Sequence, residues 1–164
     1  MMNHLLPIEK RDSVLSKMAE LLEKERTNLK TINQQDIINY SGDDLAMEKR
    51  LLVDDTKIDG MILSLQQLAS QEDPIGVERF NFDHANGMKI INKTAAFGTI
   101  MIIYESRPDV TVEAGGIAFK SGNKILLKGG KESLLSNLKI VELWHQALTE
   151  NNVSTEWVEY LNYN

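Results

Sequence analysis

The chain has 164 residues, 42% of them hydrophobic, which suits one packed domain or part of a larger one and excludes a disordered chain. With 24 acidic and 18 basic residues its formal net charge is −6, which argues against general binding to the phosphate backbone of nucleic acids. The absence of cysteine excludes disulfides, cysteine-ligated zinc and a thiol nucleophile within these 164 residues.

The sequence carries no signal for membrane insertion or export. No apolar run approaches the roughly 18–20 residues that cross a bilayer. The first segment, Met1–Lys10, lacks the basic region followed by an apolar stretch that marks a signal peptide. We therefore expect no membrane association and a cytoplasmic location.

The segment before Pro74 has helical periodicity, with apolar residues three, four and seven apart. A first helix is predicted to begin near Pro7, because proline suits a first helical turn. Its apolar stripe consists of Val14, Leu15, Met18, Leu21, Leu22 and Leu29. Two short helices are predicted over Ile32–Tyr40 and Asp43–Leu52.

A fourth helix is predicted to follow a cap at Asp54 or Asp55 and to end before the helix breaker Pro74. Its buried face consists of Ile58, Met61, Ile62, Leu65 and Leu68. The acidic pairs Asp43-Asp44 and Asp54-Asp55 are interpreted as helix caps rather than as catalytic carboxylates.

After Pro74 the apolar period falls to two, which indicates strands. The segments Val77–Asp83 and Met88–Lys93 are predicted to pair as a β-hairpin. Asn86 and Gly87 lie between them and favour the positive φ angles of a tight turn.

The second half of the chain predicts a βαβ unit. The apolar run Thr99–Tyr104 is typical of a strand buried on both faces, as in a parallel sheet. A helix over Thr111–Lys120, ended by a left-handed cap at Gly122, leads to a second buried strand, Ile125–Lys128. A helix over Glu132–Leu148 follows, and this order predicts a right-handed crossover. The apolar face of that helix carries Leu134, Leu135, Leu138, Val141, Trp144 and Leu148.

Two buried strands do not complete a sheet, because their exposed edges would promote aggregation. After Asn151 the periodic signal fades. The expectation is therefore that the chain is the beginning of a larger α/β unit.

The first candidate site is Lys128-Gly129-Gly130-Lys131-Glu132, at the predicted strand-to-helix junction. Two glycines let the backbone pass close to a ligand, and a helix N-terminus offers free N–H groups and a partial positive charge. The two lysines add charge for a phosphate. The segment fits a plain glycine-rich connection equally well, because it has neither the P-loop signature nor the GxGxxG fingerprint.

The second candidate site is the segment 104–109, YESRPD, at the carboxyl end of the first buried strand, where open α/β sheets bind ligands. Arg107 is a candidate for holding a carboxylate or phosphate through paired N–H donors. Alternatively, Glu105 and Arg107 form a structural ion pair. The three histidines are far apart in the sequence, and no metal site is predicted.

Residues 97–133 read FGTIMIIYESRPDVTVEAGGIAFKSGNKILLKGGKES. In combination, the YE-x-RP-x-V-T block, the KSGN turn and the KGGKE block resemble the cofactor-binding segment of the γ-glutamyl phosphate reductases, a family of the aldehyde dehydrogenase superfamily. The upstream segments KRLLVDDTKIDGM and QEDPIG are also similar to the N-terminal region of that family. The resemblance covers essentially the whole chain but only the first part of the family's length.

The resemblance implies an α/β chain that forms the N-terminal part of an aldehyde-dehydrogenase-like fold. Its parts are a helical N-terminal region over 1–76, a β-hairpin of the kind used for oligomer contacts over 77–95, and an incomplete Rossmann-like cofactor-binding domain over 96–164. The implied activity is the NADPH-dependent reduction of L-glutamyl 5-phosphate to glutamate 5-semialdehyde, a step of proline biosynthesis, by a homo-oligomer.

In this family a cysteine attacks the acyl phosphate, because a thiolate is a strong nucleophile near neutral pH. The cysteine is expected beyond Asn164, so this chain alone is expected to be inactive. The cofactor-binding residues that the resemblance implies are Lys128, Gly129, Gly130, Lys131 and Glu132, and its substrate-binding residues are Ser106 and Arg107. The resemblance implies that Lys128 contacts the adenosine ribose. It implies that Lys131 and Glu132 lie where the 2′-phosphate or the ribose is bound.

One departure from the family pattern is the pair Gly115 and Gly116, inside a helix where many relatives have alanine. Two such glycines cost roughly 1–2 kcal/mol relative to alanine. They indicate either close helix packing or a weaker helix.

Three other functions stay open at this point. The chain could be a non-catalytic dinucleotide-binding or assembly module. It could belong to another aldehyde dehydrogenase acting on a different acyl substrate, although the YESRPD and KGGKE blocks count against this. It could also come from the reductase half of a bifunctional pyrroline-carboxylate synthase.

Overall fold

The structure, a computed structural model, describes residues 5–162. Its first helices are α1 (Ile8–Lys24), α2 (Arg26–Asn39), α3 (Leu45–Leu51) and α4 (Asp55–Ser70). As predicted, α1 begins directly after Pro7. The prediction that one helix carries the whole stripe is wrong, because the chain turns at Glu25 and Leu29 lies on α2, which is longer than the predicted 32–40. The apolar spacing continues across this one-residue turn because both helices face the same core.

Aspartate side chains cap α3 and α4. Asp44 accepts a hydrogen bond from the N–H of Ala46 at 2.8 Å, and Asp54 accepts one from the N–H of Lys57 at 2.8 Å. Each carboxylate satisfies a backbone donor that the helix leaves unpaired. The interpretation as caps is thus confirmed for Asp44 and Asp54, and Asp54 rather than Asp55 caps α4.

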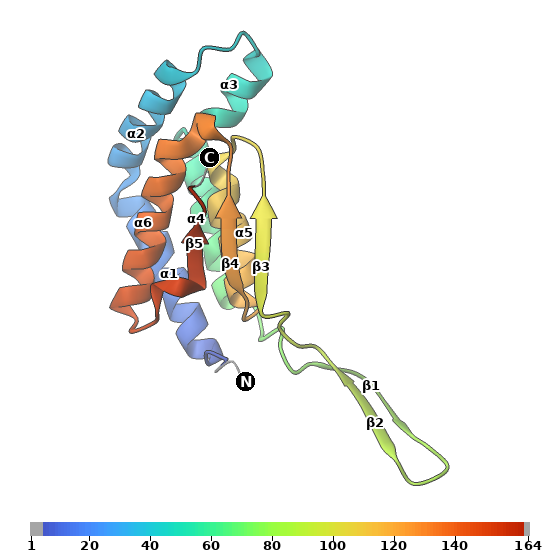
Figure 1. The fold of residues 1–164 in the computed structure, drawn as a ribbon. Helices are drawn as coiled ribbons and strands as arrows, with labels where there is room; N and C mark the ends of the chain where they lie inside the picture. The colour runs from blue at the N-terminus through green and yellow to red at the C-terminus, as the bar shows by residue number, and fades with distance from the viewer. Residues whose placement is uncertain (1–4, 163–164) are drawn as a thin grey trace.

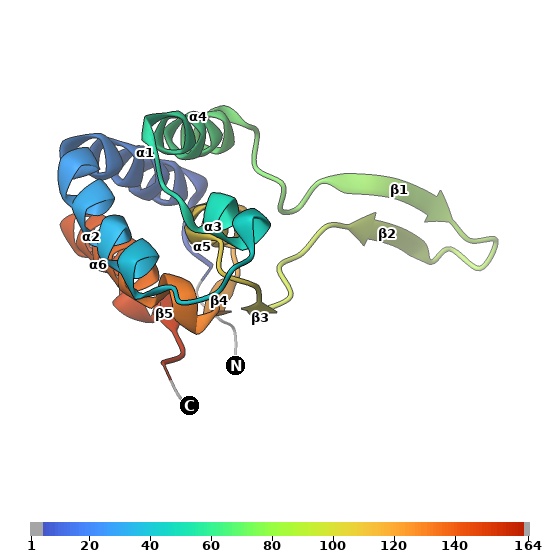
Figure 2. The same ribbon diagram turned by 90° about the horizontal axis from the view of Figure 1, so that it is seen from above.

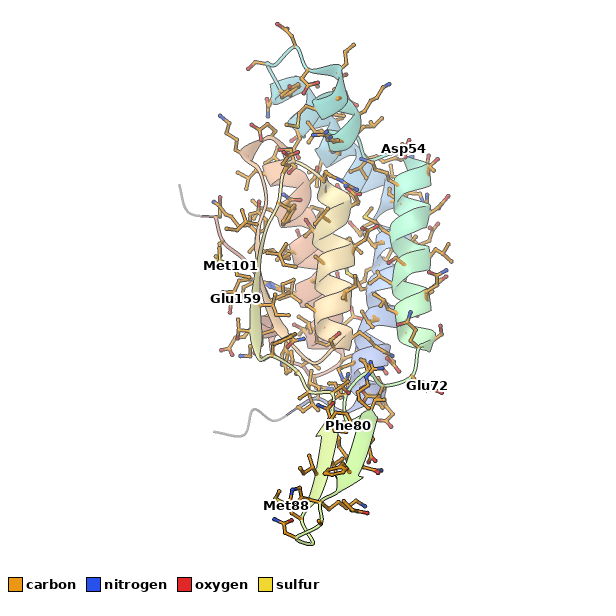
Figure 3. All side chains as sticks on the ribbon, turned by 90° about the vertical axis from the view of Figure 1, so that its right-hand side faces the viewer. Asp54, Glu72, Phe80, Met88, Met101 and Glu159 are labelled. Atoms are coloured by element: carbon orange, nitrogen blue, oxygen red, sulfur yellow. The ribbon has the colours of Figure 1, made fainter. Side chains whose placement is uncertain are left out.

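Strands β1 (Glu78–Asp83) and β2 (Lys89–Lys93) form the predicted antiparallel hairpin. Gly87 has a φ of 85° in the connecting turn, which a residue without a Cβ adopts readily. Every residue of both strands is exposed, and the hairpin projects from the rest of the structure as an arm (Figures 1 and 2). Apolar side chains such as Phe80, labelled in Figure 3, therefore lie exposed on this arm.

Three parallel strands in the order β3–β4–β5 form the second sheet. The elements are β3 (Thr99–Ile103), α5 (Pro108–Lys120), β4 (Lys124–Lys128), a 3₁₀ turn (Lys131–Ser133), α6 (Leu134–Glu150), a second 3₁₀ turn (Thr155–Trp157) and β5 (Val158–Tyr160). The predicted βαβ unit is present, and α5 starts at Pro108 rather than Thr111 because proline suits the first helical position. The sequence does not predict β5, because three residues are too few for a periodic signal.

The helices lie on one face of this sheet (Figure 2). The residues of β3 alternate between exposed and half-buried, and the side chains of Met101 and Ile103 are 50% and 73% exposed. The prediction that Thr99–Tyr104 is buried on both faces is therefore wrong for the described residues, because β3 is an edge strand with one covered face. Met101 and Glu159, labelled in Figure 3, lie on the uncovered side.

One apolar core joins helices from before and after the hairpin. Trp144, predicted on the buried face of α6, is fully buried in it. A Cβ added to Gly115 would lie 3.2 Å from the indole of Trp144, and one added to Gly116 would lie 2.9 Å from Leu68 of α4. Of the two interpretations of these glycines, close helix packing is the one that the structure confirms. Within residues 5–162, no helix has the length and apolar composition needed to span a membrane.

The packing of α5 against α4 gives a first prediction. Gly116→Val is expected to lower the free energy of unfolding by roughly 1–3 kcal/mol, because overpacked side chains force their neighbours to shift. Gly60 lies inside α4, where an added Cβ would meet no atom within 4 Å, so Gly60→Ala should raise stability by roughly 0.4–1 kcal/mol. Urea unfolding measures both variants. Equal stability of Gly116→Val and the unsubstituted chain would contradict close packing at this position.

Candidate functional site

The carboxyl ends of β3 and β4 bring the two predicted site segments together. The N–H of Tyr104 donates to the carbonyl of Lys128 at 3.0 Å, so the strands stay paired to their ends. Beyond them, Ser106 Oγ donates to Glu132 Oε2 at 2.6 Å. Ser106 is buried and Glu132 is half-buried, so this bond fixes the loop after β3 against the loop after β4.

Gly130 makes this close approach possible. Its φ of −65° is ordinary, so the requirement is for space rather than for an unusual backbone conformation. A Cβ at Gly130 would collide with Ser106 Oγ and would come within 3.1 Å of the Ser106 nitrogen. The hydrogen bond from Ser106 lowers the pKa of Glu132, although partial burial opposes ionisation. Glu132 is therefore an ionised hydrogen-bond acceptor at neutral pH.

The sequence does not predict the buried polar network beneath these loops. Asn137 of α6 lies at its centre, where Nδ2 donates to Ser133 Oγ at 2.9 Å and to Tyr160 Oη at 3.2 Å. Thr111 Oγ1 donates to Asn137 Oδ1 at 2.8 Å, and Tyr104 Oη lies 2.6 Å from Thr111 Oγ1. Burial raises the pKa of the Tyr104 phenol well above its usual value, so this hydroxyl stays protonated as a donor. The network joins the residue that follows β3, strand β5 and both crossover helices below the site.

Arg107 lies at the N-terminus of α5, and 49% of its side chain is exposed. Its Nη2 donates to Oδ2 of the buried Asp109 at 2.7 Å, and this hydrogen bond raises the pKa of the guanidinium. The alternative ion pair between Glu105 and Arg107 is not formed, because Glu105 accepts from Arg50 of α3 at 2.9 Å. Arg107 thus places a partly exposed positive charge at the carboxyl edge of the sheet.

A cavity of about 500 Å³ opens beside the loop after β4. The exposed Lys131 and the ionised Glu132 line one side of it. The other side comes mainly from the C-terminal end of α2 and the residues that follow, Asp36, Asn39, Tyr40, Ser41 and Gly42. Lys128, the last residue of β4, is half-buried next to this loop.

The prediction of free N–H groups at the N-terminus of the helix after the glycines is wrong for two of them. Asp36 of α2 accepts from the N–H of Leu135 at 3.1 Å and from the N–H of Ser136 at 2.8 Å. Asp36 is buried, and its carboxylate also accepts from Ser136 Oγ at 2.6 Å. The chain's own carboxylate therefore occupies this end of α6, and ligand phosphate groups would depend on the lysines instead.

No protein-family model matches the chain, but individual proteins of similar sequence and structure do. A γ-glutamyl phosphate reductase from Aquifex aeolicus is 36% identical over 153 residues, or 92% of this chain. The crystal structure of the γ-glutamyl phosphate reductase from Thermotoga maritima matches 97% of the chain with a TM-score of 0.90 and 33% identity. The chain is thus similar to γ-glutamyl phosphate reductases over nearly its whole length. It spans about a third of that enzyme's length, namely 35% of the Aquifex protein and 39% of the Thermotoga chain.

More distant structures share the fold alone. A succinic semialdehyde dehydrogenase from Streptococcus pyogenes, solved in complex with NADP+, matches 96% of this chain and 31% of its own with a TM-score of 0.68 and 16% identity. The helical region, the hairpin and the parallel sheet thus form part of an aldehyde-dehydrogenase-like fold. The fold and the resemblance to γ-glutamyl phosphate reductase, both predicted from the sequence, are confirmed.

Proposed function

We propose that the chain supplies about a third of an NADPH-dependent γ-glutamyl phosphate reductase, which reduces L-glutamyl 5-phosphate to glutamate 5-semialdehyde in proline biosynthesis. The observation that carries this proposal is the hydrogen bond between Ser106 and Glu132, which joins the segments 104–109 and 128–132. The chain that contains these segments is 36% identical to a reductase. They meet at the carboxyl edge of a parallel sheet, which is where open α/β sheets bind ligands.

The donor set of the cavity fits a phosphate-bearing dinucleotide. The Lys131 ammonium suits a 2′-phosphate, and the ionised Glu132 carboxylate suits ribose hydroxyls. Lys128 is proposed to contact the adenosine ribose, and Gly129 and Gly130 to let the loop lie close to the ligand. When bound, the dinucleotide supplies the hydride for the reduction.

The segment 104–109 is proposed to face the substrate. Arg107 binds an anionic group of L-glutamyl 5-phosphate through its exposed N–H groups. Ser106 contributes by holding the Arg107 loop in place, since its hydroxyl is bonded to Glu132. The chain has no cysteine to attack the acyl phosphate, so by itself it is proposed to be inactive. The exposed hairpin is proposed to contact another subunit of a homo-oligomer.

A chimera tests this function. In it, the chain replaces the homologous segment of the Aquifex reductase. The assay follows the reverse reaction, in which glutamate 5-semialdehyde and phosphate give L-glutamyl 5-phosphate while NADP+ is reduced to NADPH. This direction avoids the unstable acyl phosphate as a starting material. We expect the chimera to be active, and we expect Lys131→Met to raise the KM for NADP+ more than the KM for NAD+, because only NADP+ carries the 2′-phosphate.

The controls separate the other functions. The unmodified Aquifex reductase shows that the assay works, and the 164-residue chain alone should give no turnover. A folded chimera that binds NADP+ without turnover would contradict the reductase proposal and favour a non-catalytic dinucleotide-binding module. Turnover by the 164-residue chain alone would contradict its proposed inactivity.

A further inference from the structure

A buried carboxylate lies beneath Arg107. Asp109, in the first turn of α5, is 8% exposed, and its Oδ2 accepts from Arg107 Nη2 at 2.7 Å. Its Oδ1 is buried and has no hydrogen-bond partner among residues 5–162. The N-terminus of α5 favours a negative charge at this position. One oxygen of the Asp109 carboxylate is therefore bonded to the guanidinium, and the other accepts no hydrogen bond from the described residues.

Lys57 adds a second positive charge from another helix. It lies in the first turn of α4, and its Nζ donates to the carbonyls of Arg50 at 2.7 Å and Lys49 at 3.3 Å. Partial burial lowers the pKa of Lys57, while the charge of Asp109 raises it and that of Arg107 lowers it further. Arg50, whose carbonyl accepts from Lys57, also donates from Nη1 to Glu105 at 2.9 Å, so the end of α3 connects Lys57 to the loop that carries Arg107. The carbonyls at the end of α3 hold the ammonium in place.

The two basic side chains and one carboxylate sum to one positive charge, and 49% of the Arg107 side chain is exposed. A guanidinium has five N–H donors, and the hydrogen bonds among the described residues use one of those of Arg107. An exposed arginine samples many rotamers, and ordering it costs free energy. The bond to the buried Asp109 has already restricted that freedom.

We propose that Asp109 and Lys57 are positioning residues that prepare Arg107 to bind an anion. Asp109 orients the guanidinium, and Lys57 keeps the net charge of the group positive, so that the remaining N–H donors of Arg107 meet anionic oxygen atoms. This inference rests on the proposed function and deepens it. The recognised chemistry is a carboxylate or a phosphate, and L-glutamyl 5-phosphate carries one at each end.

NMR titration of the 164-residue chain tests this proposal, with inorganic phosphate and L-glutamate as separate probes at constant ionic strength. The Nε–H signal of Arg107 reports its orientation and its contact with the anion. Asp109→Asn separates orientation from charge. It makes the net charge more positive, so charge alone predicts tighter anion binding, whereas loss of positioning predicts binding about tenfold weaker, as for the loss of one charged hydrogen bond.

Asp59→Asn is the matched control. It removes a carboxylate from another arginine ion pair, Arg26–Asp59 on the surface, and changes the net charge equally. We expect it to leave anion binding unchanged. Lys57→Met should weaken binding while the Arg107 signal of the unliganded chain stays in place. Thermal unfolding confirms that each variant is folded. If Asp109→Asn does not fold, Lys57→Met still tests the proposal.

The proposal is overturned if a folded Asp109→Asn variant binds as tightly as the unsubstituted chain or more tightly. It is also overturned if Lys57→Met has no effect, or if neither probe shifts the Arg107 signal of the unsubstituted chain. A response to phosphate alone assigns the site to the phosphate end of the substrate, and a response to L-glutamate alone assigns it to the carboxylate end. An inactive chimera together with intact anion binding would reject the reductase function and leave this site standing.

Discussion

Trp144→Ala is expected to lower the free energy of unfolding by about 3–5 kcal/mol, as large-to-small substitutions of buried aromatic residues do. The Trp144 side chain is fully buried on α6, and its ring centre lies 6.2 Å from that of Phe119 on α5. Its indole also packs directly against Gly115, so alanine would leave a cavity between the two helices. Since whole domains are stable by only about 5–15 kcal/mol, the variant should retain little stability.

Trp144→Phe is the informative control. The Nε1 of Trp144 is buried and has no hydrogen-bond partner among the described residues, so phenylalanine removes an unsatisfied donor while keeping most of the aromatic contact. We expect this variant to lose less than about 1.5 kcal/mol. Urea unfolding measures both variants, with Trp157, the other tryptophan of the chain, as the fluorophore. A loss below about 1 kcal/mol for Trp144→Ala would contradict the packing described for α5 and α6.

The elements that the sequence predicts correctly have signals within a few residues. Asn86 and Gly87 favour a tight turn, and the hairpin forms around them. Asp44 and Asp54 cap donors two and three residues away. The break at Glu25 has no such signal, because the apolar spacing is the same before and after it. The edge position of β3 is not local either, since it depends on which strands are its neighbours.

In the candidate site, too, the local features are predictable from the sequence and the contacts between distant residues are not. The KGGKE and YESRPD segments are recognisable by composition and by their place at strand ends. Their mutual contact, Ser106 to Glu132, joins residues 26 apart, and the contact of Asp36 with Ser136 joins residues 100 apart. No spacing rule predicts such pairs. Asn137 and Thr111 gave one usable signal, because polar residues at core-facing helical positions require buried partners.

Two buried basic side chains, Arg11 and Lys120, connect the end of α5 to α1 through hydrogen bonds and ion pairs. Arg11 is 1% exposed, and its Nη2 donates to Asp73 Oδ2 at 2.6 Å. The same guanidinium donates to the carbonyl of Leu6 at 3.0 Å and to that of Lys120. Lys120 is itself 2% exposed and pairs with Asp12 at 2.6 Å. Removal of one acidic partner would leave an uncompensated charge in the interior, which is costly.

Asp73→Ala is therefore expected to lower the free energy of unfolding near neutral pH by about 3 kcal/mol. This is the lower end of the range for breaking a buried pair, because 33% of the Asp73 side chain is exposed. Urea unfolding measures the loss. Asp59→Ala removes an exposed partner of Arg26 and should cost only about 0–1 kcal/mol, as surface ion pairs do.

The pH dependence identifies the source of this stability. Burial opposes ionisation of Asp73, but hydrogen bonds from Arg11 and from the N–H of Ile75 outweigh it and lower the pKa of the carboxyl. A carboxyl whose pKa is lower in the folded chain contributes fully above its unfolded value, about 3.9 for aspartate, and loses that contribution as the pH falls through the folded value. The difference between the unsubstituted chain and Asp73→Ala should thus stay constant from neutral pH down to about pH 5 and shrink below about pH 4. A difference that is unchanged at the lowest pH would show that the charge of Asp73 does not stabilise the buried Arg11, and the energetic role given to this pair would be wrong.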